Sequence, residues 1–165
     1  RKMRMSAHYY AYAQDVIEAI KNGGDGEALD KYDLDKMWDA MHKMLTGKNM
    51  FEAMSAGEIF TTPNPLSWAI FGRDTAGKDG SEAVSYADAD DTKAVAKAMQ
   101  STDIDALLAN VNFTGFGEAG TCPEIWEYEG EFEDIKAELK EHFNGLLSFY
   151  QNAADKGLGV LIVIA

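Results

Sequence analysis

Hydrophobic residues recur every three or four positions in two long stretches of the chain, which is the pattern of an amphipathic helix. The first predicted helix begins at Asp33, whose carboxylate can accept backbone N–H bonds, and ends at Gly47. Its apolar positions are Leu34, Met37, Trp38, Met41 and Leu45. The second runs from Phe132 to Lys156, and about 26 helical residues would extend about 39 Å. Gly145 weakens this helix, because an interior glycine costs about 1 kcal/mol relative to alanine.

Shorter patterns predict strands at the two ends of the chain. Ala7–Tyr12 is rich in tyrosine, and Val160–Ile164 is a continuous run of apolar residues. A third short strand is expected at Val84–Tyr86. The remaining predicted helices are one through Val16 and Ile20 that Gly23 ends, one over Pro65–Phe71 that Gly72 ends, one through Val95 and Met99, and one from about Asp103 to Ala109.

These elements predict an α+β fold for residues 1–165: a single compact domain whose helices pack on a small sheet that pairs the two termini. The chain has 165 residues, and 46% of them are hydrophobic, enough for a substantial core without disulfides. Cys122 is the only cysteine, which is typical of a cytoplasmic protein. The longest apolar run, Gly159–Ala165, is far shorter than the roughly 20 residues that span a bilayer.

The net charge of the chain limits the classes of partner that we expect it to bind. Lys and Arg number 15 against 28 Asp and Glu, which gives a net charge of −13. Binding to nucleic acid requires clustered basic residues, and anionic membrane surfaces attract basic segments. We therefore expect neither nucleic acid nor a membrane as a partner.

Gly115–Gly120 has the G-x-G-x-x-G spacing of a phosphate cradle. The cradle works where a strand delivers the glycines to a helix N-terminus, and Glu118 would place a negative charge inside it. No return strand with an acidic residue follows at the expected distance. A surface loop is the better interpretation of this segment.

Histidines and the cysteine provide no complete catalytic or metal-binding set. Asp39 with His42, and Glu138 with His142, could each share a helix face, but di-iron bundles need two matching pairs and further glutamates. A lone cysteine such as Cys122 is more often a small buried hydrophobe than a nucleophile, although a distant histidine partner stays possible. The sequence predicts no catalytic residue, no metal and no cofactor.

Acidic residues are dense between Glu124 and Glu141, where only two lysines oppose them. A highly charged face often serves only for solubility. The sharper interpretation is a surface that attracts a basic protein, because aromatic residues alternate with the carboxylates as they do at interface hot spots. The candidate binding residues are Glu124, Trp126, Glu127, Glu129 and Glu131.

Three blocks resemble the YfbM-like bacterial proteins, a family of proteins with a domain of unknown function (DUF1877). The blocks are Asp33–Trp38 with His42 and Leu45–Gly47, then Asn64–Gly72, and last Phe149–Tyr150 with Gly157–Ile164. They follow the family's order across nearly the whole chain. The resemblance implies a compact α+β domain and brings no catalytic role.

A second candidate group lies on the first predicted helix. Asp35, Trp38 and His42 are spaced i, i+3 and i+7, close to one helical stripe. They could bind a small ligand or act in an enzyme, or Trp38 could pack in the core while the polar side chains satisfy neighbouring loops. The leading hypothesis is a non-enzymatic cytoplasmic binding protein, such as an immunity or inhibitor protein that neutralises a basic toxin. The alternative is a ligand-binding protein or enzyme built around Asp35 and His42.

Overall fold

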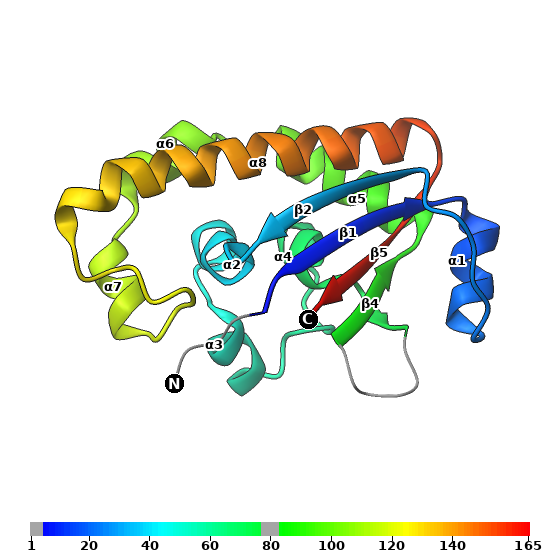
Figure 1. Ribbon diagram of the computed structural model, residues 1–165, viewed down its shortest axis with the longest axis horizontal. Coiled ribbons are helices and arrows are strands. Elements are labelled where there is room, and N and C mark those ends of the chain that lie inside the picture. The colour runs from blue at the N-terminus through cyan, green and yellow to red at the C-terminus, as the bar shows by residue number, and fades with distance from the viewer. Residues whose placement is uncertain (1–4, 77–82) are drawn as a thin grey trace.

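The computed structural model describes residues 5–76 and 83–165. The strands of this part form one antiparallel sheet in the order β2-β1-β5-β4-β3 (Figure 1). The N-terminal strand β1 (Ala7–Tyr12) pairs with the C-terminal strand β5 (Gly159–Ile164), which confirms the predicted pairing of the termini. The other strands are β2 (Asp30–Asp35), β3 (Asp74–Thr75) and β4 (Ala83–Ala87).

Helices cover mainly one face of the sheet. Along β1 the side chains of Ala7, Tyr9 and Ala11 are buried, whereas the alternate residues are only half-buried. The Tyr9 hydroxyl donates a hydrogen bond of 3.1 Å to the carbonyl of Ile70 in α4 (Pro65–Phe71). Figure 1 shows α4 and α5 (Ala89–Gln100) behind the sheet, and α8 (Phe132–Asp155) along its β2 edge. An antiparallel sheet can leave its second face to solvent in this way.

The predicted helices over Pro65–Phe71, through Val95 and near Asp103–Ala109 are present. The last of these is α6 (Ile104–Asn110). The other helices are α1 (Gln14–Lys21), α2 (Trp38–Thr46), α3 (Met50–Ser55) and α7 (Phe113–Glu118), with a short 3-10 turn η1 over Glu129–Glu131. In the described part of the chain, no helix is both long and apolar enough to cross a membrane.

The long helix α8 is continuous through Gly145, and its 24 residues extend about 36 Å. The glycine leaves room for the Tyr32 side chain of β2. A Cβ atom at position 145 would lie 2.5 Å from Cε1 of Tyr32. The Tyr32 hydroxyl also lies 2.8 Å from Nδ1 of His142, one turn earlier in the helix. Gly145 is therefore a site of close strand–helix contact.

The helix predicted from Asp33 begins five residues later, at Trp38, and the prediction for its start is wrong. Residues 30–35 form β2 instead, because they pair with β1 and bury Leu34. Asp35 then turns the chain with a φ of 53°, and the Asp33 carboxylate accepts its N–H at 2.7 Å. The predicted end is confirmed, since Gly47 has a φ of 86°.

The glycine-rich segment at 115–120 was expected to be a loop, but most of it belongs to α7. The Asn112 side chain accepts the N–H of Gly115 at 3.1 Å and caps the helix. Phe113 and Phe116, three residues apart, are both buried. A capped helix with two buried aromatic residues outweighs the low helical propensity of its glycines. α7 follows α6 and not a strand, so the segment is not built as a phosphate cradle.

Candidate functional site

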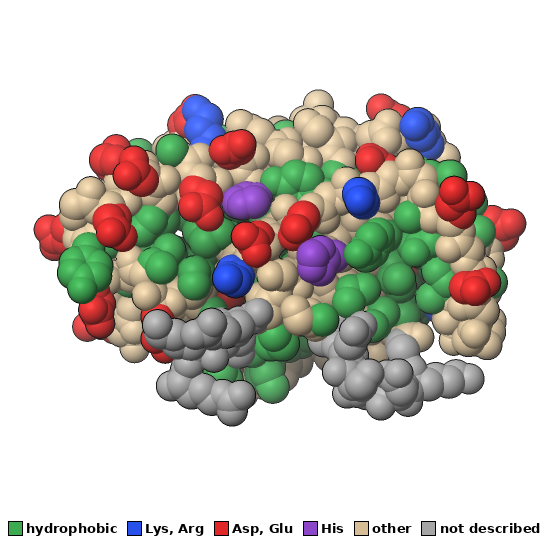
Figure 2. Space-filling view, in the orientation of Figure 1, with side chains coloured by type: hydrophobic (Ala, Val, Ile, Leu, Met, Phe, Trp, Pro, Cys, Tyr) green, Lys and Arg blue, Asp and Glu red, His purple; other side chains and the backbone are tan. Residues whose placement is uncertain are grey.

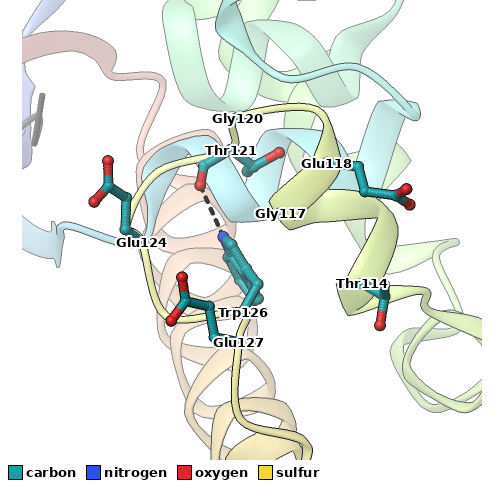
Figure 3. Close-up of a pocket in the computed structure, with 8 residues that line it drawn as sticks. All are labelled: Thr114, Gly117, Glu118, Gly120, Thr121, Glu124, Trp126 and Glu127. Carbon is teal, nitrogen blue, oxygen red and sulfur yellow. Dashed lines mark hydrogen bonds between the residues drawn. The ribbon is translucent and has the colours of Figure 1, made fainter.

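A cavity of about 590 Å³ lies between α7 and the segment that connects it to α8. Its lining residues are Thr114, Gly117, Glu118, Gly120, Thr121, Glu124, Trp126 and Glu127. Figure 3 shows Trp126 at the centre, with Glu124 and Glu127 to one side of it and Glu118 to the other. The structure thus brings three of the predicted residues, Glu124, Trp126 and Glu127, into one cavity.

Trp126 is a rigid apolar wall of this cavity. Only 6% of its surface is exposed, and its ring centroid lies 5.1 Å from those of both Phe113 and Phe116. The indole N–H donates a hydrogen bond of 2.7 Å to the Thr121 carbonyl. Gly117 permits this packing, because a Cβ there would lie 3.1 Å from the Trp126 Cβ. The glycine that looked like part of a phosphate motif thus makes room for the tryptophan.

Two buried polar side chains, Asp39 of α2 and Asn49 at the N-cap of α3, hold the segment 119–122, which carries part of the cavity wall. Asn49 donates hydrogen bonds from Nδ2 to the Ala119 carbonyl at 2.8 Å and to Oγ1 of Thr121 at 3.2 Å. The Asp39 carboxylate accepts the N–H of Cys122 at 2.9 Å. Burial raises the pKa of Asp39, and the backbone N–H groups that it binds oppose this shift.

The carboxylates of Glu118, Glu124 and Glu127 are exposed at the rim. None of them has a described Lys, Arg or His within ion-pair distance. The nearby lysines of α8 are engaged elsewhere, Lys136 with Glu133 and Lys140 with Asp105. These carboxylates therefore leave a negative field at the mouth of the cavity.

The other predicted acidic residues lie outside the cavity, on the same end of the molecule. Glu129 and Glu131 belong to the turn η1 and are exposed. Tyr128 precedes this turn, and 64% of its surface is exposed. Figure 2 shows several acidic side chains at the end of the molecule where α7 and the start of α8 lie. We call this surface the acidic end and define it by Glu118, Glu124, Glu127, Tyr128, Glu129 and Glu131.

The stripe predicted for Asp35, Trp38 and His42 is wrong, because Asp35 is in a strand and not in the helix. It is exposed at the end of β2, where its carboxylate accepts a hydrogen bond from the Ser6 hydroxyl at 3.1 Å. Trp38 is buried and donates its indole N–H to the Met5 carbonyl. Among the described residues, Asp35 and His42 share no hydrogen bond or ion pair. The polar cluster proposed around them is not assembled.

His42 is buried with both ring nitrogens occupied. Nδ1 lies 2.5 Å from the Lys48 carbonyl and Nε2 lies 2.8 Å from the Ser67 hydroxyl. Because a carbonyl can only accept, the proton is on Nδ1 and Nε2 accepts from Ser67. Burial lowers the pKa of His42 to about 4, so the ring is neutral at pH 7.

The hydrogen bond between Ser67 and His42 has the form of a nucleophile and its base. The serine is buried in α4, however, and the adjacent cavity measures about 70 Å³, room for about two waters. Such a space excludes most substrates. A structural role for the pair agrees with the tendency of buried polar groups to be hydrogen-bonded.

No group of three His, Cys, Asp or Glu residues in ranges 5–76 and 83–165 is placed to hold a metal ion. His142 of the predicted pair with Glu138 instead meets the Tyr32 hydroxyl. Asp39, the partner predicted for His42, binds the N–H groups of Met50 and Cys122.

Fold and site together define a small single-domain α+β protein with an antiparallel sheet, a long C-terminal helix and an acidic cavity at one end. The chain belongs to the family described as Domain of unknown function (DUF1877), whose profile matches residues 3–163. This confirms the family resemblance found in the sequence.

A solved structure supports the same fold. The chain is similar to the crystal structure of a protein of unknown function, YfbM from Escherichia coli, with 22% sequence identity and a TM-score of 0.75. The match covers 98% of this chain and 100% of the other. Curated proteins provide no significant match.

Proposed function

We propose that this chain is a cytoplasmic binding protein that engages a basic partner protein through its acidic end. An immunity protein that neutralises a basic toxin is the kind of protein in which such a surface is useful. The observation that carries the proposal is the 590 Å³ cavity, in which Trp126 forms a wall beneath three carboxylates without a described cation. No catalytic step is part of the proposal.

The chemistry of the cavity suits a lysine or arginine side chain. Both have an apolar stem that can lie against an aromatic ring while the charged head reaches a carboxylate. Glu124 and Glu127 flank Trp126 on one side and Glu118 lies on the other, so a basic side chain in the cavity would meet negative charge across it. Partner lysines or arginines would therefore supply the charge that the rim lacks.

A protein partner fits better than a single small cation, because the acidic surface extends beyond the cavity. Glu129 and Glu131 of η1 are exposed, and the exposed Tyr128 directly follows the cavity residue Glu127 in the chain. Tyrosine is one of the residues enriched at the hot spots of protein interfaces. Like charges spread over such an area also speed association with an oppositely charged protein.

The test compares two triple variants of equal net charge for binding to a short arginine-rich peptide. The site variant is Glu118→Gln, Glu124→Gln and Glu127→Gln. The control variant is Asp25→Asn, Glu27→Gln and Asp155→Asn, which removes three exposed charges remote from the cavity. Binding is measured by isothermal titration calorimetry at low ionic strength.

We expect the site variant to bind the peptide about 10- to 100-fold more weakly than the wild type, since each exposed carboxylate contributes about 0.5–1 kcal/mol. The control variant should lose much less. Equal weakening in the two variants would show that only total charge matters and would refute the proposed site.

A further inference from the structure

Asp39 and Asn49 are completely buried, yet their polar atoms bind a segment more than sixty residues away along the chain. We propose that these two side chains are positioning residues that set the wall of the acidic cavity and so its affinity for a basic partner. This inference rests on the proposed function for its link to binding. The claim that Asp39 and Asn49 hold the cavity wall rests on the hydrogen bonds alone.

Asp39 joins two separate segments through its two carboxylate oxygens. Oδ1 accepts the N–H of Met50 at 2.7 Å, and Oδ2 accepts the N–H of Cys122 at 2.9 Å. Met50 is the first residue of α3, and Cys122 directly follows the cavity residue Thr121. Asp39 thereby fixes the start of α3 and the cavity wall to the same point of α2.

Asn49 makes a parallel connection from the N-cap of α3. Its Oδ1 accepts the N–H of Glu52 at 2.9 Å, and its Nδ2 binds Ala119 and Thr121 as described above. The side chain therefore caps the helix on one side and holds the wall on the other. Both polar atoms of the Asn49 amide therefore form hydrogen bonds.

α7 and Trp126 hold the wall from its other side. The N–H of Thr121 donates to the Phe116 carbonyl at 2.9 Å, and its own carbonyl accepts from Trp126. Thr121 is thus fixed by α7 on the outside, by Asn49 on the inside and by the tryptophan of the cavity. Release of the inner side would let Thr121 shift, and Trp126 is bonded directly to it.

Chemistry explains why an aspartate stands at position 39. A carboxylate offers an acceptor to each of two N–H groups, whereas the amide of asparagine has one acceptor oxygen and a donor. In the Asp39→Asn variant, one of the two backbone N–H groups would face another donor. The shape of the side chain is kept, so the change tests the connection and not the packing.

The experiment measures amide hydrogen exchange and peptide affinity in the same full-length proteins. The variants are Asp39→Asn and Thr121→Val, the second of which removes one Asn49 bond from the opposite side. Asp155→Asn is the control, because it removes an exposed carboxylate at the C-terminal end of α8, where no ion pair involves it among the described residues. Affinity for the arginine-rich peptide is measured well below the melting temperature of each protein.

We expect the amides of residues 120–122 to exchange about tenfold faster in both variants, while the central amides of α8 keep their wild-type rates. Peptide binding should weaken about 3- to 10-fold with every rim carboxylate still present. A purely structural role would lower the melting temperature without changing the affinity of the folded protein. The control should match the wild type in both measurements.

Two results would overturn the inference. One is exchange that stays unchanged at 120–122 or rises equally throughout the protein. The other is faster exchange confined to 120–122 with wild-type affinity. A wild-type protein that does not bind the peptide would instead refute the proposed function, and the exchange rates would still decide whether Asp39 and Asn49 hold the wall.

Discussion

Replacing Gly145 by alanine should destabilise the protein, although alanine is the better helix former. Helix propensity alone predicts a gain of about 1 kcal/mol. The new Cβ, however, would lie 2.5 Å from Cε1 and 2.6 Å from the hydroxyl oxygen of Tyr32. Forcing extra volume into a packed contact costs about 1–3 kcal/mol. Moving the tyrosine also removes its bond to His142, worth about 0.5–1.5 kcal/mol. The net expectation is a loss of about 0.5–3.5 kcal/mol.

The sign of this effect should reverse when Tyr32 is shortened. In a Tyr32→Ala background the space beside Gly145 is open, and Gly145→Ala should stabilise by about 1 kcal/mol. Urea unfolding of the wild type, both single variants and the double variant gives the four free energies and their coupling. Asn144→Ala is the control, since this exposed neighbour should gain about 0.5 kcal/mol from propensity.

Stabilisation by Gly145→Ala in the wild-type background would refute the reasoning. So would an equal effect in the two backgrounds, because the tyrosine contact would then have no influence.

Three further predictions concern the buried histidine and two helix ends. The pKa of His42 falls from 6.5 to about 4 on folding, so its contribution to stability is present above pH 6.5 and is lost as pH falls toward 4. Between pH 6.5 and pH 4, the free energy of unfolding measured with urea should fall by about 3 kcal/mol more in the wild type than in the His42→Gln variant. An equal fall in the two proteins would contradict this. Asn64→Ala should cost about 1 kcal/mol in thermal unfolding, because Asn64 accepts the N–H of Leu66 at the start of α4; no change would exclude that cap. Gly47→Ala should cost about 1 kcal/mol in the same assay, as its φ is 86°, and neutrality would count against that conformation.

The elements that depend on residues close together in the sequence could be predicted from the sequence alone. The apolar stripe of α8 is long and regular, and Gly47 and Gly72 end their helices as expected. β2 was missed because its identity depends on pairing with β1, whose residues lie 19 to 28 positions earlier in the sequence. The apolar residues Leu34 and Met37 fit the helical period by coincidence, and the pairing overrides that period.

The sequence of α7 contains the local signals of a short helix. Asn112 is a good N-cap residue, and Phe113 and Phe116 have the spacing of one helix face. The spacing of the glycines at 115–120 resembles a phosphate motif and obscures this helical signal. Gly117 proves to be the position against which Trp126 packs.

The candidate site was predicted in part. Glu124, Trp126 and Glu127 are close in sequence and were found through composition. Glu118 lies in α7, before the acidic segment, and composition alone does not connect it with the cavity. Asp39 and Asn49 were not connected with this region, because the hydrogen bonds that matter join residues 70 to 83 positions apart. Only the folded chain reveals such contacts.

The most direct test of the central claim is a map of where a basic peptide contacts the protein. Amide chemical shifts of the isotope-labelled wild type are recorded during titration with the arginine-rich peptide. The account predicts that the largest changes occur at Gly117, Gly120 and Thr121 and at the Trp126 indole N–H. Small changes spread evenly over the acidic residues, or a maximum away from α7, would contradict the claim that this cavity receives a basic partner.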